Sequence, residues 1–240
     1  MTILVVGASG ATGRLLVAQL LESGNAVKAV VRAESRVLDA FSDRAALSLE
    51  RANIGDLADE DIAQLVDGCS AMVSCLGHTL SFKGIYGQPR RLVTDATRKL
   101  CRAVKQHKSD TPVKFILMNT TGNSNRDIPE RISLGQTCVI GLLRLLLPPH
   151  VDNERAADVL RTEIGQNDSR VEWVVVRPDG LTDEVEVTEY SLHPSPVRSA
   201  IFDAGTTSRI NVGNFMTRLI TDQNVWDKWK GQMPVIYNAE

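Results

Sequence analysis

The sequence predicts an α/β protein in which helices flank a doubly wound, mainly parallel sheet. Short apolar runs alternate with longer helical patterns along the 240 residues. Most of the apolar runs lack polar alternation, which is typical of strands that are covered on both faces. A glycine-rich turn joins the first run to the first helical pattern. Alternating strands and helices need crossover connections, which are right-handed and build such a sheet.

Seven short apolar runs are predicted to be strands, because they are too short for helices and lie between turn or helical segments. In chain order they are Ile3–Val6, Val27–Val31, Ala46–Leu49, Ala71–Cys75, Lys114–Met118, Trp173–Val176 and Pro234–Tyr237. Segments with apolar residues at helical spacing are predicted to be helices. They are Thr12–Ser23, Asp59–Val66, Pro89–Lys105, Asn153–Ile164 and Asn214–Thr221.

Three segments do not fit this alternation. Residues 78–88 follow the fourth predicted strand and residues 122–149 follow the fifth, so both leave carboxyl ends of strands, where such sheets bind ligands. The segment of about 182–208 follows the sixth strand and is predicted to form a small cap on the substrate side. The sequence contains no repeat and no linker, so residues 1–240 are predicted to form a single domain.

Composition narrows the classes of partner. The 27 Lys and Arg residues nearly balance the 29 Asp and Glu residues, so we expect neither nucleic acid nor an anionic membrane as a partner. The four cysteines form no Cys-x-x-Cys pair and none lies beside a histidine at ligand spacing, so no metal site is expected. The chain opens with an apolar strand and a glycine turn, which is not the pattern of a signal peptide. A cytoplasmic protein is the expectation.

The turn after the first strand has the spacing Gly-x-x-Gly-x-x-Gly. In a strand–turn–helix unit, Gly7 permits the tight turn, Gly10 lets the backbone approach a pyrophosphate, and Gly13 lets the helix pack closely on the strand. The unpaired N–H groups and dipole of the helix N-terminus attract phosphate. We therefore predict an NAD(P)-binding domain of Rossmann type; a plain turn that needs small residues is the alternative. The predicted cofactor-binding residues of this loop are Gly7, Ser9, Gly10, Ala11, Thr12, Gly13 and Arg14.

The choice of dinucleotide depends on the residue after the second strand. Enzymes that use NAD usually place Asp or Glu there, to hold the ribose 2′-hydroxyl. This chain has Arg32, whose planar guanidinium can pair with a 2′-phosphate. Arg14 and Arg36 are close enough in sequence to assist. NADP(H) is therefore the preferred cofactor, with NAD(H) as the alternative if Arg32 is only a solvated charge.

Further motifs follow in the order that is typical of the short-chain dehydrogenase/reductase superfamily. They are Gly55-Asp56-Leu57, Ser74-Cys75-Leu76-Gly77, Asn119-Thr120-Thr121-Gly122, Arg177-Pro178-Asp179-Gly180 and Ser208-Arg209-Ile210-Asn211-Val212. Together with the glycine turn they span nearly the whole chain. The sequence resembles the atypical NAD(P)H-binding branch of that superfamily, which includes NmrA-like redox sensors and the biliverdin-IXβ and flavin reductases.

The resemblance implies roles for residues along the cofactor. Asp56 and the backbone of Leu57 would face the adenine, although Asp56 also suits the N-cap of the following helix. Cys75, Leu76 and Gly77 would line the ribose on the nicotinamide side.

The resemblance also implies residues around the nicotinamide. Asn119, Thr120 and Thr121 would end the fifth strand beside it, with Thr121 where the family commonly has a serine. Arg177 and Pro178 would close over the nicotinamide end. From the residues alone, Asn119 to Thr121 are equally suitable as turn formers.

One feature of the larger superfamily is missing. Its carbonyl reductases use Tyr-x-x-x-Lys, in which the lysine lowers the pKa of the tyrosine that delivers a proton. None of the three tyrosines of this chain has a lysine four residues later. In the helix that normally carries the motif, the matching register holds His150 and Glu154.

The missing acid favours an acceptor that does not need one. Reduction of an isolated ketone creates an alkoxide, which needs a positioned proton or oxyanion donor. Flavins, quinones and bilins delocalise the added electrons and can take a proton from water. The sequence therefore predicts an NADPH-dependent reductase that transfers hydride to an apolar or aromatic conjugated acceptor of this kind. A non-catalytic NADP(H)-binding sensor or regulatory protein of NmrA-like type is the alternative.

Three residues are candidate catalytic groups. His150 is a candidate because histidine is the side chain best suited to proton transfer near neutral pH, and it lies at a predicted helix start, where a capping role is the alternative. Tyr86 lies in the loop after the fourth strand, where packing is the alternative, and Thr121 occupies the position of the family serine. His78 and Lys83, in the same loop as Tyr86, are predicted to be solvated.

The segment 139–147 is almost entirely aliphatic and is interrupted only by Arg144. It suits an apolar lid over a hydrophobic acceptor or the contact surface of an oligomer. An ordinary loop that packs on the core is the third interpretation.

Overall fold

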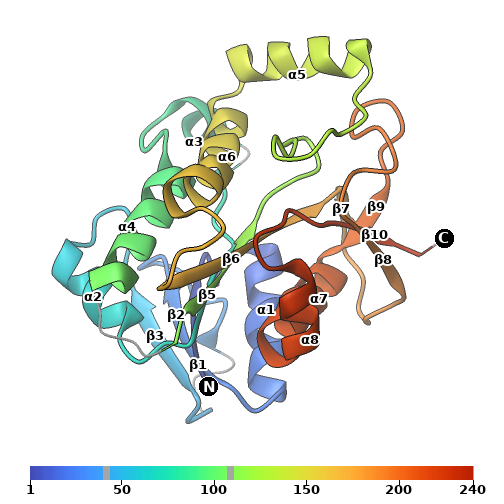
Figure 1. Cartoon of the computed structure of the whole chain (residues 1–240). Helices are drawn as coiled ribbons and strands as arrows, with labels where there is room; N and C mark the ends of the chain where they lie inside the picture. Colours follow the sequence, from blue (N-terminus) through green and yellow to red (C-terminus); the bar gives the residue numbers. More distant parts are fainter. Residues whose placement is uncertain (40–43, 80, 107–110, 240) are drawn as a thin grey trace.

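The computed structural model describes residues 1–39, 44–79, 81–106 and 111–239 (Figure 1). One eight-stranded sheet runs through the molecule in the order β3-β2-β1-β4-β5-β6-β10-β8. Its strands are parallel except for β8, which is antiparallel to β10. This arrangement confirms the predicted doubly wound, mainly parallel sheet with flanking helices.

Seven strands of the sheet agree with the predicted runs to within a few residues, and β8 was not predicted as a strand. In the sheet they are β1 (Thr2–Val6), β2 (Ala26–Val31), β3 (Leu47–Arg51), β4 (Ala71–Ser74), β5 (Val113–Met118), β6 (Val171–Pro178), β8 (Tyr190–His193) and β10 (Val235–Asn238). The chain order reverses direction between β1 and β4, which are neighbours. Open sheets of this kind bind ligands beyond the carboxyl ends of the strands at such a switch point.

The two faces of the sheet carry separate apolar cores. Successive residues of β1 alternate between them: Ile3 and Val5 belong to the core under α1 (Ala11–Glu22), and Leu4 and Val6 to the core on the opposite face. This alternation is the two-residue period of a strand. Because both faces are buried, the strand shows no polar positions, and its sequence reads as a continuous apolar run.

The helices divide between the two faces (Figure 1). One face carries α1, α7 (Arg209–Thr221) and α8 (Gln223–Trp229), and α1 packs along α7. The other face carries α2 (Asp59–Val66), α4 (Leu92–Gln106), α6 (Pro148–Asp158) and the π-helical turn η2 (Val159–Ile164), with α4 between α2 and α6.

Two helices begin earlier than the sequence predicts. The helix expected at 153–164 begins at Pro148, because proline is tolerated in the first turn, where no N–H partner is needed. The helix expected at 214–221 begins at Arg209, since the Ser208 side chain accepts a hydrogen bond from the Asn211 N–H and caps it.

The segments predicted to be irregular contain regular structure. The loop after β4 forms the short helix α3 (Phe82–Tyr86), and residues 122–149 contain helix α5 (Leu134–Leu146). The predicted cap contributes β8 to the main sheet, and β9 (Thr206–Ser208) pairs with β7 (Gly180–Thr182). The interpretation of residues 139–147 as an ordinary loop packed on the core is therefore wrong.

Among the described residues, no single helix is long and apolar enough to cross a membrane. The helices 134–146 and 148–164, which meet at a bend of 104°, are long and apolar enough only when taken together, by length and composition alone.

Candidate functional site

Two of the three glycines of the turn after β1, Gly7 and Gly13, lie where a side chain would collide with backbone. Gly7 has φ +74°, and a Cβ there would lie 2.6 Å from the carbonyl carbon of Cys75. A Cβ at Gly13 would lie 2.3 Å from the Gly7 oxygen. The turn therefore packs directly against the loop after β4 and against the first turn of α1.

Helix α1 begins in this turn without a side-chain cap. Its N-cap is Gly10, which offers no side-chain acceptor to the free N–H groups of the first turn. The first turn contains Ala11, and Thr12 is buried, whereas Arg14 is exposed. Uncapped N–H groups and the positive end of the helix dipole make this turn suitable for a phosphate.

The loop after β4 forms the second wall of the switch point. The Cys75 N–H donates to the Val6 carbonyl oxygen (2.9 Å), which places Cys75 beside the end of β1. Burial raises the pKa of the Cys75 thiol to about 12, so it stays protonated and uncharged at neutral pH. Leu76 packs against the core, whereas Gly77 faces open space.

Arg32 lies directly after the end of β2, as predicted. Its side chain is 62% exposed, and among the described residues it pairs with the carboxylate of Glu34, at 3.8 Å between Nε and Oε1. An ion pair between two exposed side chains contributes little to stability. The guanidinium is therefore available to an anionic ligand at this edge of the sheet.

Asp56 lies in the loop between β3 and α2. It is exposed and accepts a hydrogen bond from the Asn53 side chain (3.1 Å). The alternative interpretation of Asp56 as the N-cap of the following helix is wrong, because α2 begins at Asp59 and its N-cap is Ala58. Lys99 of α4 donates to the Leu57 carbonyl oxygen (3.0 Å) and so holds this loop against the helix.

Three polar residues directly follow β5 (Val113–Met118), and their side chains are bound to other parts of the protein. The Asn119 amide donates to the Asn153 carbonyl oxygen of α6 (2.8 Å). The Thr120 hydroxyl accepts from the Gly122 N–H (3.3 Å). Thr121 is buried and its hydroxyl donates to the Asp179 carboxylate (3.0 Å). Since that proton is already shared with a carboxylate, Thr121 is a poor proton donor to a ligand.

The structure brings His150 next to this strand end. A Cβ added to Gly122 would lie 3.6 Å from Cε1 of His150. One turn later in α6, Glu154 lies 3.4 Å from the His150 ring (Oε1 to Nε2) and receives two nitrogens of Arg144, at 2.8–3.0 Å. The residues in the register of Tyr-x-x-x-Lys thus form a histidine–glutamate–arginine cluster.

The charge state of Glu154 follows from these contacts. Its side chain is only 6% exposed. Burial opposes ionisation, but the interactions with the nearby His150 ring and with the Arg144 guanidinium outweigh it and lower the pKa of the carboxyl to about 2. Glu154 is therefore a carboxylate throughout the physiological range and is not a general acid.

This pKa predicts a pH-dependent contribution to stability. Because the folded-state pKa is below the ordinary 4.5, the contribution is complete above about pH 4.5 and is lost as the pH falls toward 2. We expect Glu154→Gln to lower the free energy of unfolding by about 2–3 kcal/mol at neutral pH. The difference from the unmutated protein should shrink at about pH 3. Urea denaturation at both pH values measures it, and an equal difference at both would contradict the assignment.

A second buried cluster was not predicted from sequence. His78 follows the β4 loop, and its side chain is only 7% exposed, so the expectation that it is solvated is wrong. Its Nε2 lies 2.8 Å from the Asp152 carboxylate and its Nδ1 lies 3.2 Å from the Gly84 carbonyl oxygen. Asp152 also accepts from the backbone N–H groups of Val93 and Thr94. The side chain of Lys83 lies outside the described part of the structure.

The hydrogen bonds of Asp152 set its charge. Burial raises the pKa of this carboxyl, but the bonds from His78, Thr94 and the backbone outweigh that cost and hold the pKa below its usual range. Both ring nitrogens of His78 thus lie within hydrogen-bonding distance of an oxygen atom. The cluster joins the loop after β4 to α4 and α6.

Tyr86 lies at the end of α3 and points to helix α5. Its hydroxyl donates to the Leu146 carbonyl oxygen (3.1 Å), and its ring contacts Phe82 at 5.0 Å between centroids. The contact with α5 supports the packing alternative for Tyr86.

Arg177 has a different role from the predicted one. Its side chain is fully buried, so it does not close over a ligand. Its guanidinium donates to the Glu130 carboxylate (2.7 Å) and to the carbonyl oxygens of Asn123 (2.9 Å) and Met233 (2.7 Å). The Arg177 side chain therefore forms a buried junction that joins β6 to the loop after β5 and to the segment before β10. Pro178 follows as the last residue of β6.

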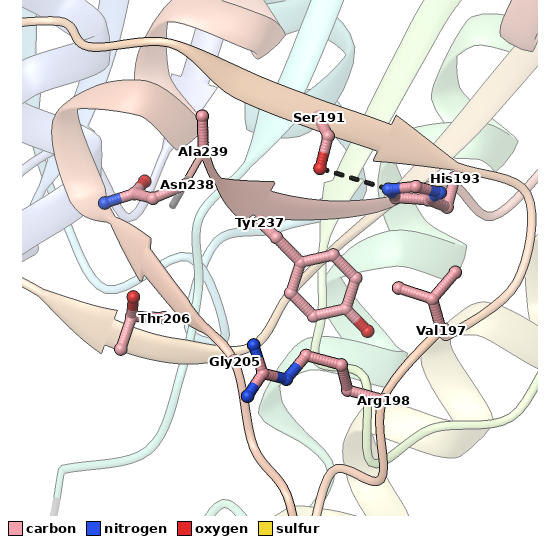
Figure 2. A pocket seen from close by; sticks show the side chains of 9 residues that line it. All are labelled: Ser191, His193, Val197, Arg198, Gly205, Thr206, Tyr237, Asn238 and Ala239. Atoms are coloured by element: carbon pink, nitrogen blue, oxygen red, sulfur yellow. Dashed lines mark hydrogen bonds between the residues drawn. The ribbon is translucent and has the colours of Figure 1, made fainter.

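A cavity of about 380 Å³ lies away from the glycine turn, between β8, β10 and the segment before β9 (Figure 2). Tyr237 lies at its centre, where burial and the nearby Asp179 raise the pKa of its hydroxyl. A Cβ at Gly205 would lie 2.5 Å from the Tyr237 ring, so this wall needs glycine. The Gly205 N–H donates to Asp179 (2.9 Å), which also accepts the Thr121 hydroxyl. Asp179 thus connects the cavity to the end of β5.

The residues at the switch point fit a dinucleotide. The uncapped N-terminus of α1 suits a pyrophosphate, and a side chain at Gly10 would extend into the space beside it. No group of three or more metal-ligating side chains occurs within the described ranges. Fold and site together define a nucleotide-binding α/β protein of Rossmann type.

The comparisons with known proteins agree. The model of an NAD(P)H-binding family matches residues 7–223, so the chain belongs to that family. This match confirms the predicted assignment to an NAD(P)H-binding family. No curated protein matches it.

Solved structures share the fold at low sequence identity. An anaerobillin reductase from Escherichia coli O157:H7 aligns with a TM-score of 0.70 and 15% identity, covering 100% of this chain and 98% of that one. A proposed NADH-flavin reductase from Streptococcus pneumoniae aligns with a TM-score of 0.66 and 16% sequence identity, covering 100% of both chains. A short-chain dehydrogenase/reductase from Veillonella parvula was solved with NADP. It aligns with a TM-score of 0.67 and 16% sequence identity, covering 99% of this chain and 94% of that one.

Proposed function

We propose that this protein is an NADPH-dependent reductase that transfers hydride to a conjugated acceptor such as a flavin, quinone or bilin. The observation that carries the proposal is the pairing of an uncapped glycine cradle with a strand end where the Thr121 hydroxyl and the nearby Glu154 carboxylate are bound to protein partners. When bound, the dinucleotide supplies the hydride. The chain supplies the phosphate cradle and the walls of the site. Thr121 and Glu154 have their protons or charges committed to protein partners.

The nature of the acceptor follows because neither Thr121 nor Glu154 is available to supply a proton. His150 lies beside the end of β5, where its Nε2 is 3.4 Å from the permanent carboxylate of Glu154. A conjugated acceptor can take its proton from water, so it needs no protein acid. The names of two structural neighbours, an anaerobillin reductase and a proposed NADH-flavin reductase, are in keeping with this acceptor class.

The preference for NADPH depends on Arg32. We expect Arg32→Ala to weaken NADPH binding about 10- to 100-fold, because a charge-assisted hydrogen bond to the 2′-phosphate is lost. NADH, which lacks that phosphate, is the internal control and should bind nearly as before. Titrations followed by cofactor fluorescence measure both affinities. An unchanged ratio of the NADPH and NADH affinities would show that Arg32 does not set a preference and would remove the assignment of NADPH.

The test of the whole proposal is cofactor consumption by the purified protein. NADPH and NADH are each supplied with free flavins, quinones and bilins, and the absorbance of the reduced cofactor is followed. We expect saturable turnover with one acceptor class and a preference for NADPH. If NADPH binds but no acceptor is reduced, the reductase is excluded and the NmrA-like sensor takes its place. Such a sensor must bind oxidised and reduced cofactor with different affinities.

A further inference from the structure

Helix α5 and its neighbours form an exposed apolar surface, which we call the α5 surface. Its members are large apolar side chains at least two-fifths exposed. They are Leu134, Leu142, Leu145 and Leu146 of α5, Phe82 and Tyr86 of α3, and Phe202 of the loop before β9. Exposed apolar residues that occur singly need no explanation, but a continuous group of this kind marks an interaction site.

The outward face of α5 carries no charge. Leu134, Cys138, Leu142 and Leu145 recur at helical spacing and are all exposed. Gln136 and Ile140 are the buried residues of the helix. Its one charged residue, Arg144, turns to Glu154 of α6. A helix of this kind on a globular protein lacks the polar face that water requires.

Aromatic side chains border both ends of the helix. At the C-terminal end, Tyr86 bonds to the Leu146 carbonyl oxygen and contacts Phe82. At the N-terminal end, a Cβ on Gly135 would lie 3.3 Å from the Phe202 ring, so that ring covers the first turn. In Figure 1, α5 lies across one end of the molecule, with α3 near its C-terminal end. Leucines flanked by aromatic rings are typical of helices that lie in a membrane interface.

Arginines flank the surface at both ends. Arg90 donates to the Tyr86 carbonyl oxygen (3.3 Å), and Arg91 follows it. Arg131 lies three residues before α5. In the part of the chain that the structure describes, none of the three has a carboxylate within 4.0 Å, and all are exposed.

The acids beside the surface are already neutralised. Asp203, next to Phe202, pairs with Arg198 at 2.9 Å, and Asp127, in the loop before α5, pairs with Arg161. The border of the surface is therefore locally positive, although the whole chain has a net charge of −2.

These charges distinguish between two occupants. If a second copy packed its α5 antiparallel on this one, Arg131 of each copy would face Arg90 and Arg91 of the other. If the two helices were parallel, Arg131 would face Arg131. Like charges are brought together in both cases, and the described acids beside the surface, Asp203 and Asp127, are already paired. An anionic lipid surface attracts the same arginines, by roughly 1 kcal/mol for each near the membrane.

We propose that the α5 surface binds the interface of an anionic lipid bilayer. A 13-residue helix is about 20 Å long, shorter than the ~30 Å hydrocarbon core, so α5 lies in the interface and does not cross it. The leucines and aromatic rings enter the boundary between headgroups and acyl chains, and the arginines contact the lipid phosphates. The near-neutral composition predicted no membrane partner; the local distribution of charge is the reason for this different inference.

The experiment is vesicle flotation of the full-length protein without cofactor or acceptor, so its outcome is independent of the proposed reductase activity. One set of vesicles contains phosphatidylcholine alone and the other contains added phosphatidylglycerol. The apolar variant is Leu142→Gln with Leu145→Gln. The charge variant is Arg90→Gln, Arg91→Gln and Arg131→Gln. The matched control is Val185→Gln with Val187→Gln, two exposed apolar residues on another loop. Thermal unfolding verifies that each variant is folded.

We expect the protein and the control to float with the anionic vesicles. The apolar variant should lose about tenfold or more in partitioning, and the charge variant about fivefold for each arginine removed. The absence of flotation, or flotation that neither variant weakens, would overturn the proposal. A stable dimer in sedimentation velocity that the leucine substitutions dissociate would assign the surface to a second copy instead.

Discussion

Replacement of Gly10 by valine should abolish dinucleotide binding while leaving the protein folded. The backbone at Gly10 has φ −70° and ψ 164°, which any residue adopts. A Cβ there would meet only the Gly7 oxygen, at 3.2 Å, and the Cys75 oxygen, at 4.0 Å. We therefore expect a stability cost of about 1 kcal/mol. The rest of the side chain extends beside the N-terminus of α1, into the space that a pyrophosphate needs.

The expected loss of affinity is roughly 100-fold or more, since the phosphate contacts at the helix N-terminus are excluded together. Calorimetric titration with NADPH measures it, and thermal unfolding measures the stability. Gly141→Val is the matched control, because a Cβ at Gly141 meets open space on α5, away from the turn. Binding by the Gly10 variant at the affinity of this control would show that the dinucleotide lies elsewhere.

Comparison with a Gly7 variant distinguishes an effect on binding from an effect on folding. Gly7 has φ +74°, and a Cβ there would lie within 3 Å of three backbone atoms of Cys75 and Leu76. Valine at that position strains the backbone and displaces the loop after β4. A loss of binding in the Gly7 variant therefore reports on folding, whereas a loss in the Gly10 variant reports on the site.

The parts of the fold that were predictable from sequence are those that local patterns encode. The glycine spacing identifies the turn after β1 because each glycine has its own steric reason within seven residues. Likewise, the fully apolar run of β1 indicates burial on both faces. Helix α5 was not recognised because the rule for helices looks for a contrast between an apolar and a polar face. Its outward face is apolar as well, so the segment has no such contrast.

The polar clusters around the site were not predictable for a different reason. His78 and Asp152 are 74 residues apart, and Arg177 and Glu130 are 47 apart. Nothing in the local sequence shows which of several charged residues a buried partner will meet. Burial also changes the interpretation of Arg177 from a residue that contacts the cofactor to a structural one. It follows the apolar run predicted for β6, and its complete burial becomes visible only in the folded structure.

That buried junction gives the largest expected effect on stability. Glu130 is 3% exposed, accepts two hydrogen bonds and neutralises the guanidinium of Arg177, which is fully buried. We expect Glu130→Ala to lower the free energy of unfolding by about 3–5 kcal/mol, because it leaves a buried positive charge without a partner. Chemical denaturation at neutral pH measures the change. Glu186→Ala, at an exposed position, should stay within about 0.5 kcal/mol of the unmutated protein.

A double variant tests whether the cost comes from the unpaired charge. Glu130→Leu with Arg177→Met removes both charges and keeps apolar volume, so it should recover much of the stability that Glu130→Ala loses. The backbone carbonyls of Asn123 and Met233 would still lose their donor, which keeps the recovery incomplete. If the double variant is no more stable than Glu130→Ala, the contribution of Glu130 lies in its contact with the Asn125 N–H (3.0 Å) and the shape of the loop after β5 rather than in charge pairing.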